Sequence, residues 1–168
     1  MNNERTQGIV IGTVTGVKDP EGLGRIEVTY PWLTGPVQRL VSVAVPMAGG
    51  DRGMFFMPEI KDEVLLAFDQ GMFDHPYVIG FLWNPQAKAP SSDERQRMIR
   101  SKNGHTMRFV DSTAVAGNKG AVTIEDAHGN VIVLTNSHVT IKSRGAVVIE
   151  GASVTINGRL VRSAGPPI

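Results

Sequence analysis

The chain has 168 residues, enough for one domain or two small ones, and a hydrophobic content of 41%, enough for a packed core. A formal net charge of +1 argues against a strong electrostatic grip on nucleic acid, and the absence of cysteine excludes disulfides and thiolate metal sites. The polar start MNNERTQGIV lacks the apolar core of a signal peptide, and no apolar run is long enough to span a membrane. We therefore expect a chain that is made in the cytoplasm without a signal peptide.

Strand patterns dominate the first half of the chain, where β-branched and alternating apolar residues recur and helical periodicity is nearly missing. Five strands in about 75 residues predict a small closed barrel such as an OB-fold, because a sandwich normally needs about seven strands. The stretch between the third and fourth strands has no helical period and is expected to be a loop. The predicted strands cover residues 8–17, 25–30, 41–45, 62–68 and 77–83.

Residues 85–97 contain two prolines and almost no apolar side chains, which is typical of a linker. Ser91 and Glu94 have the spacing of a helix-capping pair, and a plain coil is the alternative. We predict an OB-fold domain over residues 1–84, the linker over 85–97 and a second domain over 98–168.

Short alternating pieces fill the second domain, and Met107 and Phe109 begin the series. Their regular step predicts a repeat of short strands, with units shorter than those of usual solenoids. The tripeptide Val-Thr-Ile occurs three times, starting at residues 122, 139 and 154. The later apolar pairs are Val122/Ile124, Ile132/Leu134, Val139/Ile141, Val147/Ile149 and Val154/Ile156.

Strands this short bury only two side chains each, so a lone sheet of them leaves one apolar face in water. Burying a Val or Ile fully contributes roughly 1.5–3 kcal/mol, whereas ordering the backbone costs roughly 1–2 kcal/mol per residue. No amphipathic helix is available to cover the sheet, so identical chains are the simplest partner. The sequence thus predicts three sheets around a shared axis, and the alternative is an ordinary antiparallel sheet folded onto the barrel. The expected axial core is Val122, Ile124, Ile132, Leu134, Val139, Ile141, Val147, Ile149, Val154 and Ile156.

Several short motifs in the first domain carry a family resemblance, among them Asp19-Pro20, Gly22-Leu23-Gly24-Arg25, Pro31-Trp32, Pro58-Glu59, Asp62-Glu63-Val64 and His75-Pro76. Their order and spacing resemble the OB-fold domain of phage baseplate assembly protein V and of VgrG-type spikes. The stretches SKNGHTMRFVDS and VTIEDAHGNVIVLTN resemble the start of the family's β-helical needle. The resemblance covers about residues 8–168 and implies an all-β fold, an N-terminal OB-fold barrel followed by a short intertwined trimeric β-helix (β-prism) needle.

The resemblance implies a structural spike at the centre of a contractile injection system or phage tail, with no enzyme activity and no cofactor. Such a spike caps the inner tube at the baseplate of the assembled particle and pierces the target envelope, so it meets the target membrane only on firing. Implied partners are two further copies, a tube-side hub protein, a PAAR-like tip protein and cargo or an effector, with no nucleic acid. The tip protein is expected to dock on Val161, Arg162, Ser163, Ala164, Gly165, Pro166, Pro167 and Ile168.

The residues that could carry chemistry do not converge in the sequence. His75, His105, His128 and His138 are not paired at metal-ligand spacing, although threefold symmetry could gather copies of His128 or His138 around one ion. Neighbouring strand residues point to opposite faces, so the pairs Asp62-Glu63 and Glu125-Asp126 do not form acid/base couples. About 13 residues separate the two domains, which leaves no room for the lysozyme domain that some family members carry. A spike that hydrolyses cell wall is therefore a third reading that this sequence disfavours.

The loop residues Met54, Phe55, Phe56 and Met57 are candidates for contact with the hub or baseplate, because Met and aromatic side chains favour interfaces. The alternative is that two of them close the floor of the barrel. The main alternative function is an OB-fold protein that binds an oligosaccharide or oligonucleotide and carries a β appendage. Arg25, Arg39 and Arg52 could contact phosphates in that case, with Tyr30 and Trp32 as the only obvious stacking residues.

Overall fold

The computed structural model describes residues 8–30, 39–113 and 117–161. It divides the chain into two compact units, Met1–Ala89 and Pro90–Ile168, and each unit is described by itself. The second unit begins inside the stretch predicted as a linker, and its first strand, β8, begins at Gln96.

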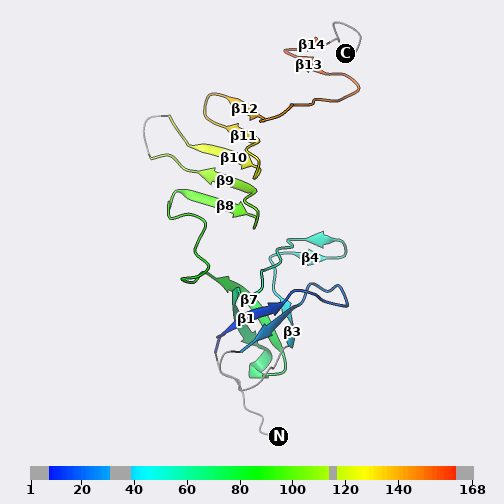
Figure 1. Cartoon of the computed structure of the whole chain (residues 1–168), viewed down its shortest axis with the longest axis vertical. Helices are drawn as coiled ribbons and strands as arrows, with labels where there is room; N and C mark the ends of the chain where they lie inside the picture. The colour runs from blue at the N-terminus through cyan, green and yellow to red at the C-terminus, as the bar shows by residue number, and fades with distance from the viewer. Residues whose placement is uncertain (1–7, 31–38, 114–116, 162–168) are drawn as a thin grey trace. The chain divides into compact units, whose positions relative to one another are not determined.

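Five strands of the first unit form a closed barrel in the order β1-β2-β3-β7-β6 (Figure 1). Neighbouring strands pair antiparallel except β3 and β7, which run parallel. This is the topology of an OB-fold, so the predicted fold of the first domain is confirmed. The strands are β1 (Val10–Gly16), β2 (Ile26–Thr29), β3 (Arg39–Val43), β6 (Glu63–Phe68) and β7 (Pro76–Leu82).

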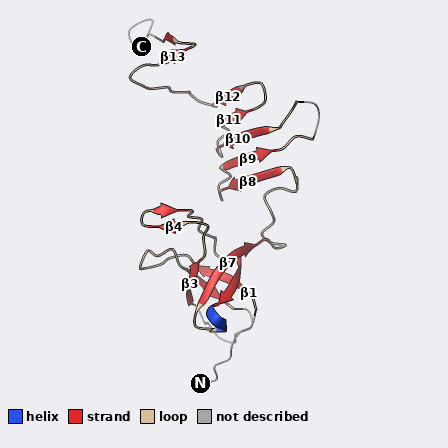
Figure 2. Cartoon of the chain, turned by 180° about the vertical axis from the view of Figure 1, so that it is seen from behind, coloured by secondary structure: helices blue, strands red, loops and turns tan. Residues whose placement is uncertain are grey.

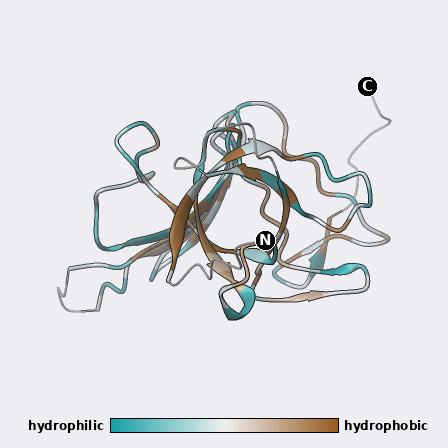
Figure 3. Cartoon of the chain, turned by 90° about the horizontal axis from the view of Figure 1, so that it is seen from below, coloured by the Kyte–Doolittle hydropathy of each residue, from teal (hydrophilic) through white to brown (hydrophobic). Residues whose placement is uncertain are grey.

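Alternation of apolar and polar residues places one side of each strand inside the barrel. Figure 3 shows this ring of strands end-on, with hydrophobic residues distributed along it. Tyr30 extends the core, because its ring lies 5.2 Å from Phe73 and 6.3 Å from Phe68 between centroids. The fully or almost fully buried core residues are Val14, Ile26, Val28, Tyr30, Val41, Val64, Leu66 and Val78.

Two small elements interrupt the predicted loops of the first unit (Figure 2). The stretch between β3 and β6 contains a hairpin of β4 (Ala48–Gly49) and β5 (Arg52–Gly53), and a single 3-10 turn, Asp69–Gly71, follows β6. Strands of two residues carry no alternation that a sequence pattern could reveal.

The second unit contains a five-stranded antiparallel sheet in which each strand pairs with the next along the chain (Figure 1). Its strands are β8 (Gln96–Arg100), β9 (Thr106–Val110), β10 (Ala121–Glu125), β11 (Val131–Leu134) and β12 (Val139–Lys142). A separate hairpin of β13 (Thr155–Ile156) and β14 (Arg159–Leu160) turns at Asn157-Gly158, whose φ angles of 50° and 73° suit a tight type I′ turn.

The structure differs from one local prediction in this region and decides between the two alternatives given for another. Val147 and Ile149 alternate like a strand, yet the segment pairs with no strand among the described residues of this chain. Alternation alone does not make a strand, because its backbone groups need a neighbouring strand to hydrogen-bond. At Ser91 no helix forms, and the Ser91 hydroxyl instead accepts a hydrogen bond from the Asp93 N–H, so the coil alternative is correct.

Candidate functional site

The five strands β8–β12 align their apolar residues into two columns on one face of the sheet. Residues directly opposite each other on paired strands share a face, so the register fixes the membership of each column. One column contains Ile99, Met107, Ile124, Ile132 and Ile141, and the other contains Arg97, Phe109, Val122, Leu134 and Val139. We call these ten residues the two-column face.

The two-column face is apolar at nine of its ten positions, and little within the chain covers it. The exposed fraction is 38% for Ile132, 48% for Phe109 and 62% for Ile141. Neighbouring strands lie about 4.8 Å apart, so each column runs about 19 Å across the sheet. A continuous apolar face of this kind marks an interaction surface.

The opposite face of the same sheet is mixed in character. It presents Thr123 and Thr140 beside Val133, and Arg108 pairs with Glu125 across β9 and β10 at 3.4 Å. Water can solvate this face, whereas the apolar two-column face needs a partner to bury it.

Six predicted axial-core residues lie together on the two-column face: Val122, Ile124, Ile132, Leu134, Val139 and Ile141. Sequence reasoning left Ile99, Met107 and Phe109 out of this set. The register adds them, since Val122 pairs with Phe109 and Ile124 with Met107.

The other four predicted axial residues lie outside this sheet. Val147 and Ile149 are exposed and have no strand partner within the described ranges, Val154 is half-buried, and Ile156 lies on β13 with 64% of its surface exposed. Of the predicted tip-docking residues, only Val161 is described; it is half exposed, and its N–H bonds to the Val154 carbonyl at 2.7 Å. Residues 162–168 lie outside the described residues.

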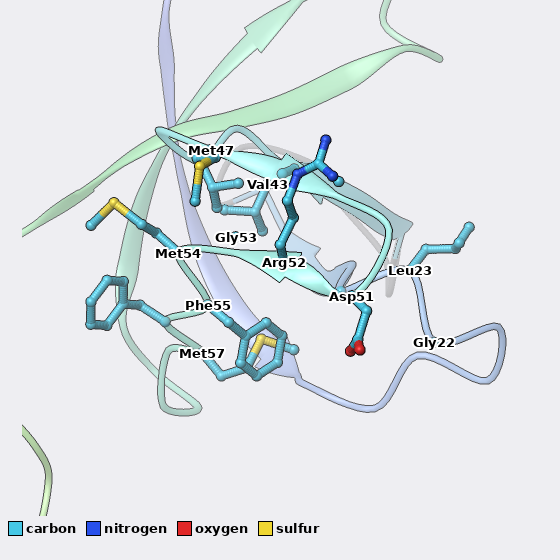
Figure 4. A pocket seen from close by; sticks show the side chains of 15 residues that line it. Gly22, Leu23, Val43, Met47, Asp51, Arg52, Gly53, Met54, Phe55 and Met57 are labelled. Carbon is cyan, nitrogen blue, oxygen red and sulfur yellow. The ribbon is translucent and has the colours of Figure 1, made fainter.

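A second apolar surface lies on the first unit, at the hairpin β4–β5. A hollow of about 620 Å³ lies there, and the turn at Gly22–Gly24 also borders it. Figure 4 shows Met47, Met54, Phe55 and Met57 around this hollow. The side chains from Met54 to Met57 range from 37% to 74% exposed, and none belongs to the buried core. The alternative in which two of them close the floor of the barrel is therefore wrong for this chain.

The basic and aromatic residues of the alternative ligand-binding function are mostly engaged elsewhere. Arg25 donates two hydrogen bonds to Asp19, at 3.1 and 2.8 Å, and Arg39 forms an ion pair with Asp74 at 2.7 Å while lying over the Phe73 ring. Tyr30 is buried in the barrel, so its ring is closed to a stacking base, and Trp32 lies outside the described residues. Among the described residues of this set, Arg25, Arg39 and Tyr30 form no common binding face, and Arg52 lines the hollow at β4–β5.

Asp19 organises the turn before β2. Its carboxylate accepts the side-chain bonds of Arg25 and the backbone N–H groups of Glu21, Leu23 and Arg25 at 3.0–3.1 Å. The Arg25 guanidinium, helped by these N–H groups, holds the pKa of Asp19 well below its usual range. Asp19 and Arg25, which belong to the motifs that carry the family resemblance, thus form a structural clamp that holds this turn.

Two histidines that are distant in sequence meet at the turns of the sheet. The rings of His105 and His128 lie 6.3 Å apart between centroids, and the Ala127 N–H donates to His105 Nδ1. Asp126 holds the second turn, because the Asn130 N–H and side chain and the His128 N–H bond to its carboxylate and lower its pKa to about 2. Only the register of β9 and β10 could have revealed this proximity.

Across the described ranges, no group of three or more His, Cys, Asp or Glu side chains is placed to hold a metal ion. The same residues include no helix with the length and hydropathy of a membrane span.

Comparisons with known proteins match both units. Residues 10–83 match the family profile of the type VI secretion system/phage-baseplate injector OB domain, and residues 96–161 match that of the phage baseplate V C-terminal trimerisation domain. A search of curated proteins found no match. The trimerisation profile begins at the first residue of β8 and includes the whole two-column face. The chain therefore belongs to the baseplate V family of spike-type proteins, in which it has a structural baseplate role and a trimerisation domain for forming a homotrimer.

Proposed function

We propose that this chain is the central spike of a contractile tail or injection system, in which it caps the inner tube, pierces the target envelope and carries a separate tip protein. The observation that carries the proposal is the two-column face within the matched trimerisation domain. Three such faces turned toward one axis bury their apolar side chains and give a stiff needle without covering helices.

Within this proposal, the two-column face and the later residues Val147, Ile149, Val154 and Ile156 form the axial core. The segment around Val147 supports the idea, because its alternating apolar residues are exposed and pair with no strand among the described residues, which suits a neighbouring chain better than solvent. The part of the predicted linker that precedes β8, residues 85–95, then serves as the connection between barrel and needle, and residues 161–168 dock the tip protein.

The barrel supplies the contact with the tube-side hub or baseplate. The exposed side chains of Met54, Phe55, Phe56 and Met57 around the hollow favour this role, because apolar and aromatic residues at a protein surface are enriched in interfaces. The protein acts mechanically in this proposal and has no catalytic step.

Particle assembly in the producing cell tests the proposal. A strain without this chain should make tubes and sheaths that lack an organised baseplate and that do not act on target cells. The unaltered chain and a Thr140→Asp variant should restore both properties, whereas Ile141→Asp should not, because only Ile141 lies on the two-column face. Normal particles in the strain without the chain, seen by electron microscopy, would overturn the proposal.

A further inference from the structure

Arg97 is the only charged residue of the two-column face. It pairs opposite Phe109 and therefore shares the face with Val122, Leu134 and Val139 in the same column. Its Nη1 donates to Asp111 Oδ2 at 2.5 Å, and the Asp111 N–H continues the strand pairing by bonding to the Arg95 carbonyl. A close ion pair thus joins β8, the first strand of a surface that is otherwise apolar, to the residue that follows β9.

Strand alternation places Asp111 on the same side of the sheet. Asp111 is two residues beyond Phe109 and four beyond Met107, so its side chain lies on the same side of the sheet as these two members of the two-column face. In the isolated chain both partners are open to water, with 64% of the Arg97 side chain and 63% of the Asp111 side chain exposed. An exposed pair of this kind contributes little to stability, whereas the same pair covered by another chain is costly to break.

We propose that the Arg97–Asp111 pair is a polar layer at the β8 end of the trimer interface that fixes how the three chains align. This inference rests on the proposed axial role of the two-column face. The apolar layers of β10, β11 and β12 consist only of Val, Ile and Leu, so hydrophobic burial alone discriminates weakly between an aligned trimer and one shifted or reversed along the axis. A single polar layer at one end of an apolar seam penalises the misaligned forms, because they bury a charge without its partner.

The chain offers a matched control pair on the opposite face of the same sheet. Arg108 and Glu125 also join adjacent strands, and their side chains are less exposed in the isolated chain, at 29% and 41%. If the trimer did not cover the two-column face, removing the less exposed Arg108–Glu125 pair would have the larger effect. The proposal predicts instead that removing the Arg97–Asp111 pair has the larger effect on the alignment of the three chains.

The first test measures thermal unfolding and alignment in the full-length chain. Arg97→Met alone should lower the Tm, because Asp111 is left unpaired in the interface, and the double variant R97M/D111L should recover the Tm fully. A double variant that recovers the Tm and keeps its three chains aligned would overturn the proposal, as would an unchanged Tm in R97M.

Alignment is read by disulfide cross-linking, which the cysteine-free sequence permits. Met107→Cys and Ile132→Cys chains, one lengthened by a tag, are refolded together and oxidised. These positions lie on β9 and β11, about 10 Å apart along the stack, which exceeds the roughly 7 Å Cα separation that a disulfide can bridge. Mixed cross-links therefore report misaligned trimers.

We expect only like-with-like cross-links in the otherwise unaltered chain and in R108M/E125L, and at least a tenfold larger mixed fraction in R97M/D111L. A mixed fraction that does not rise in R97M/D111L would overturn this inference alone. Light scattering on the same samples separates that result from a failure of the proposed function, in which the unaltered chain would not be a trimer at all.

Discussion

The barrel and the five-stranded sheet β8–β12, here called the needle sheet, cover their apolar side chains in different ways. The barrel closes on itself, and residues such as Val14, Leu66 and Val78 are fully buried within one chain. The needle sheet has one buried residue among those described, Thr106, while Ile141 and Val139 remain more than 60% exposed. A barrel buries its apolar face inside a single chain, whereas an open sheet without covering helices can bury its apolar face only against other chains.

The same substitution in the two regions gives the largest contrast. Leu66→Ala in the barrel should lower the free energy of unfolding by about 2–5 kcal/mol, because a fully buried side chain leaves a cavity. Leu134→Ala, at a position 42% exposed within the chain, should cost little in a monomer but approach that range in the trimer.

Thermal unfolding at two protein concentrations separates these effects. The loss at Leu66 should not depend on concentration, whereas the loss at Leu134 should, because it acts through association. A Leu134→Ala variant indistinguishable from the unaltered chain at both concentrations would show that the barrel and the sheet do not differ as described.

Gly120 gives a smaller, purely steric test within the needle unit. Its φ of 92° disfavours any other residue, and a Cβ there would lie 1.8 Å from the Val110 carbonyl oxygen. Gly120→Ala should therefore destabilise the junction of β9 and β10 by about 1–3 kcal/mol. Gly117→Ala is the matched control for backbone strain alone, since its φ is 84° and no atom lies within 4 Å of its Cβ position. Equal losses in the two variants, measured by chemical denaturation, would refute the steric argument.

The Asp19–Arg25 clamp predicts an acid-sensitive barrel. The pKa of Asp19 is lowered by folding, so the clamp contributes its full stability above about pH 4, the value expected in the unfolded chain, and loses it as the pH falls further. The Tm of the unaltered chain should drop more steeply below pH 4 than that of Asp19→Asn. Parallel Tm curves for the two proteins would contradict the assigned role of Asp19.

Asp126 predicts the mildest effect, a matching acid sensitivity in the needle. Folding lowers its pKa from 3.8 to about 2, mainly through the Asn130 N–H, so its contribution should be complete above about pH 4 and be lost between pH 4 and pH 2. Asp126→Asn should flatten this part of the trimer's stability curve. Light scattering from pH 5 to pH 2 monitors the dissociation of the trimer. If Asp126→Asn dissociates along the same curve as the unaltered chain, the Asp126 turn is not the origin of the acid sensitivity.

Alternation predicted the barrel strands at residues 25–30 and 41–45, whereas β-branched or apolar content between turn residues predicted the other three. It could not find β4 and β5, which have two residues each, and it placed Gln96 and Arg97 of β8 in a linker because they are polar. Their place in the sheet comes from pairing with β9, which is a long-range property.

The candidate interface was predicted in the same partial way. Periodicity identified Ile124 and Ile132 as facing one direction and Met107 as beginning the series, but only the register showed that Met107 and Ile99 lie in the same column as these two residues. The segment at Val147 shows the limit, because its partner strand does not lie among the described residues of the same chain.

The most direct test of the central claim is light scattering on the full-length chain and two variants at neighbouring positions of β11. Three copies of the 18.1 kDa chain give about 54 kDa. The unaltered chain and Val133→Asp should have this mass, whereas Ile132→Asp, on the two-column face, should run as a monomer of about 18 kDa. A stable Ile132→Asp trimer, or an unaltered chain that is monomeric, would contradict an interface built on the two-column face.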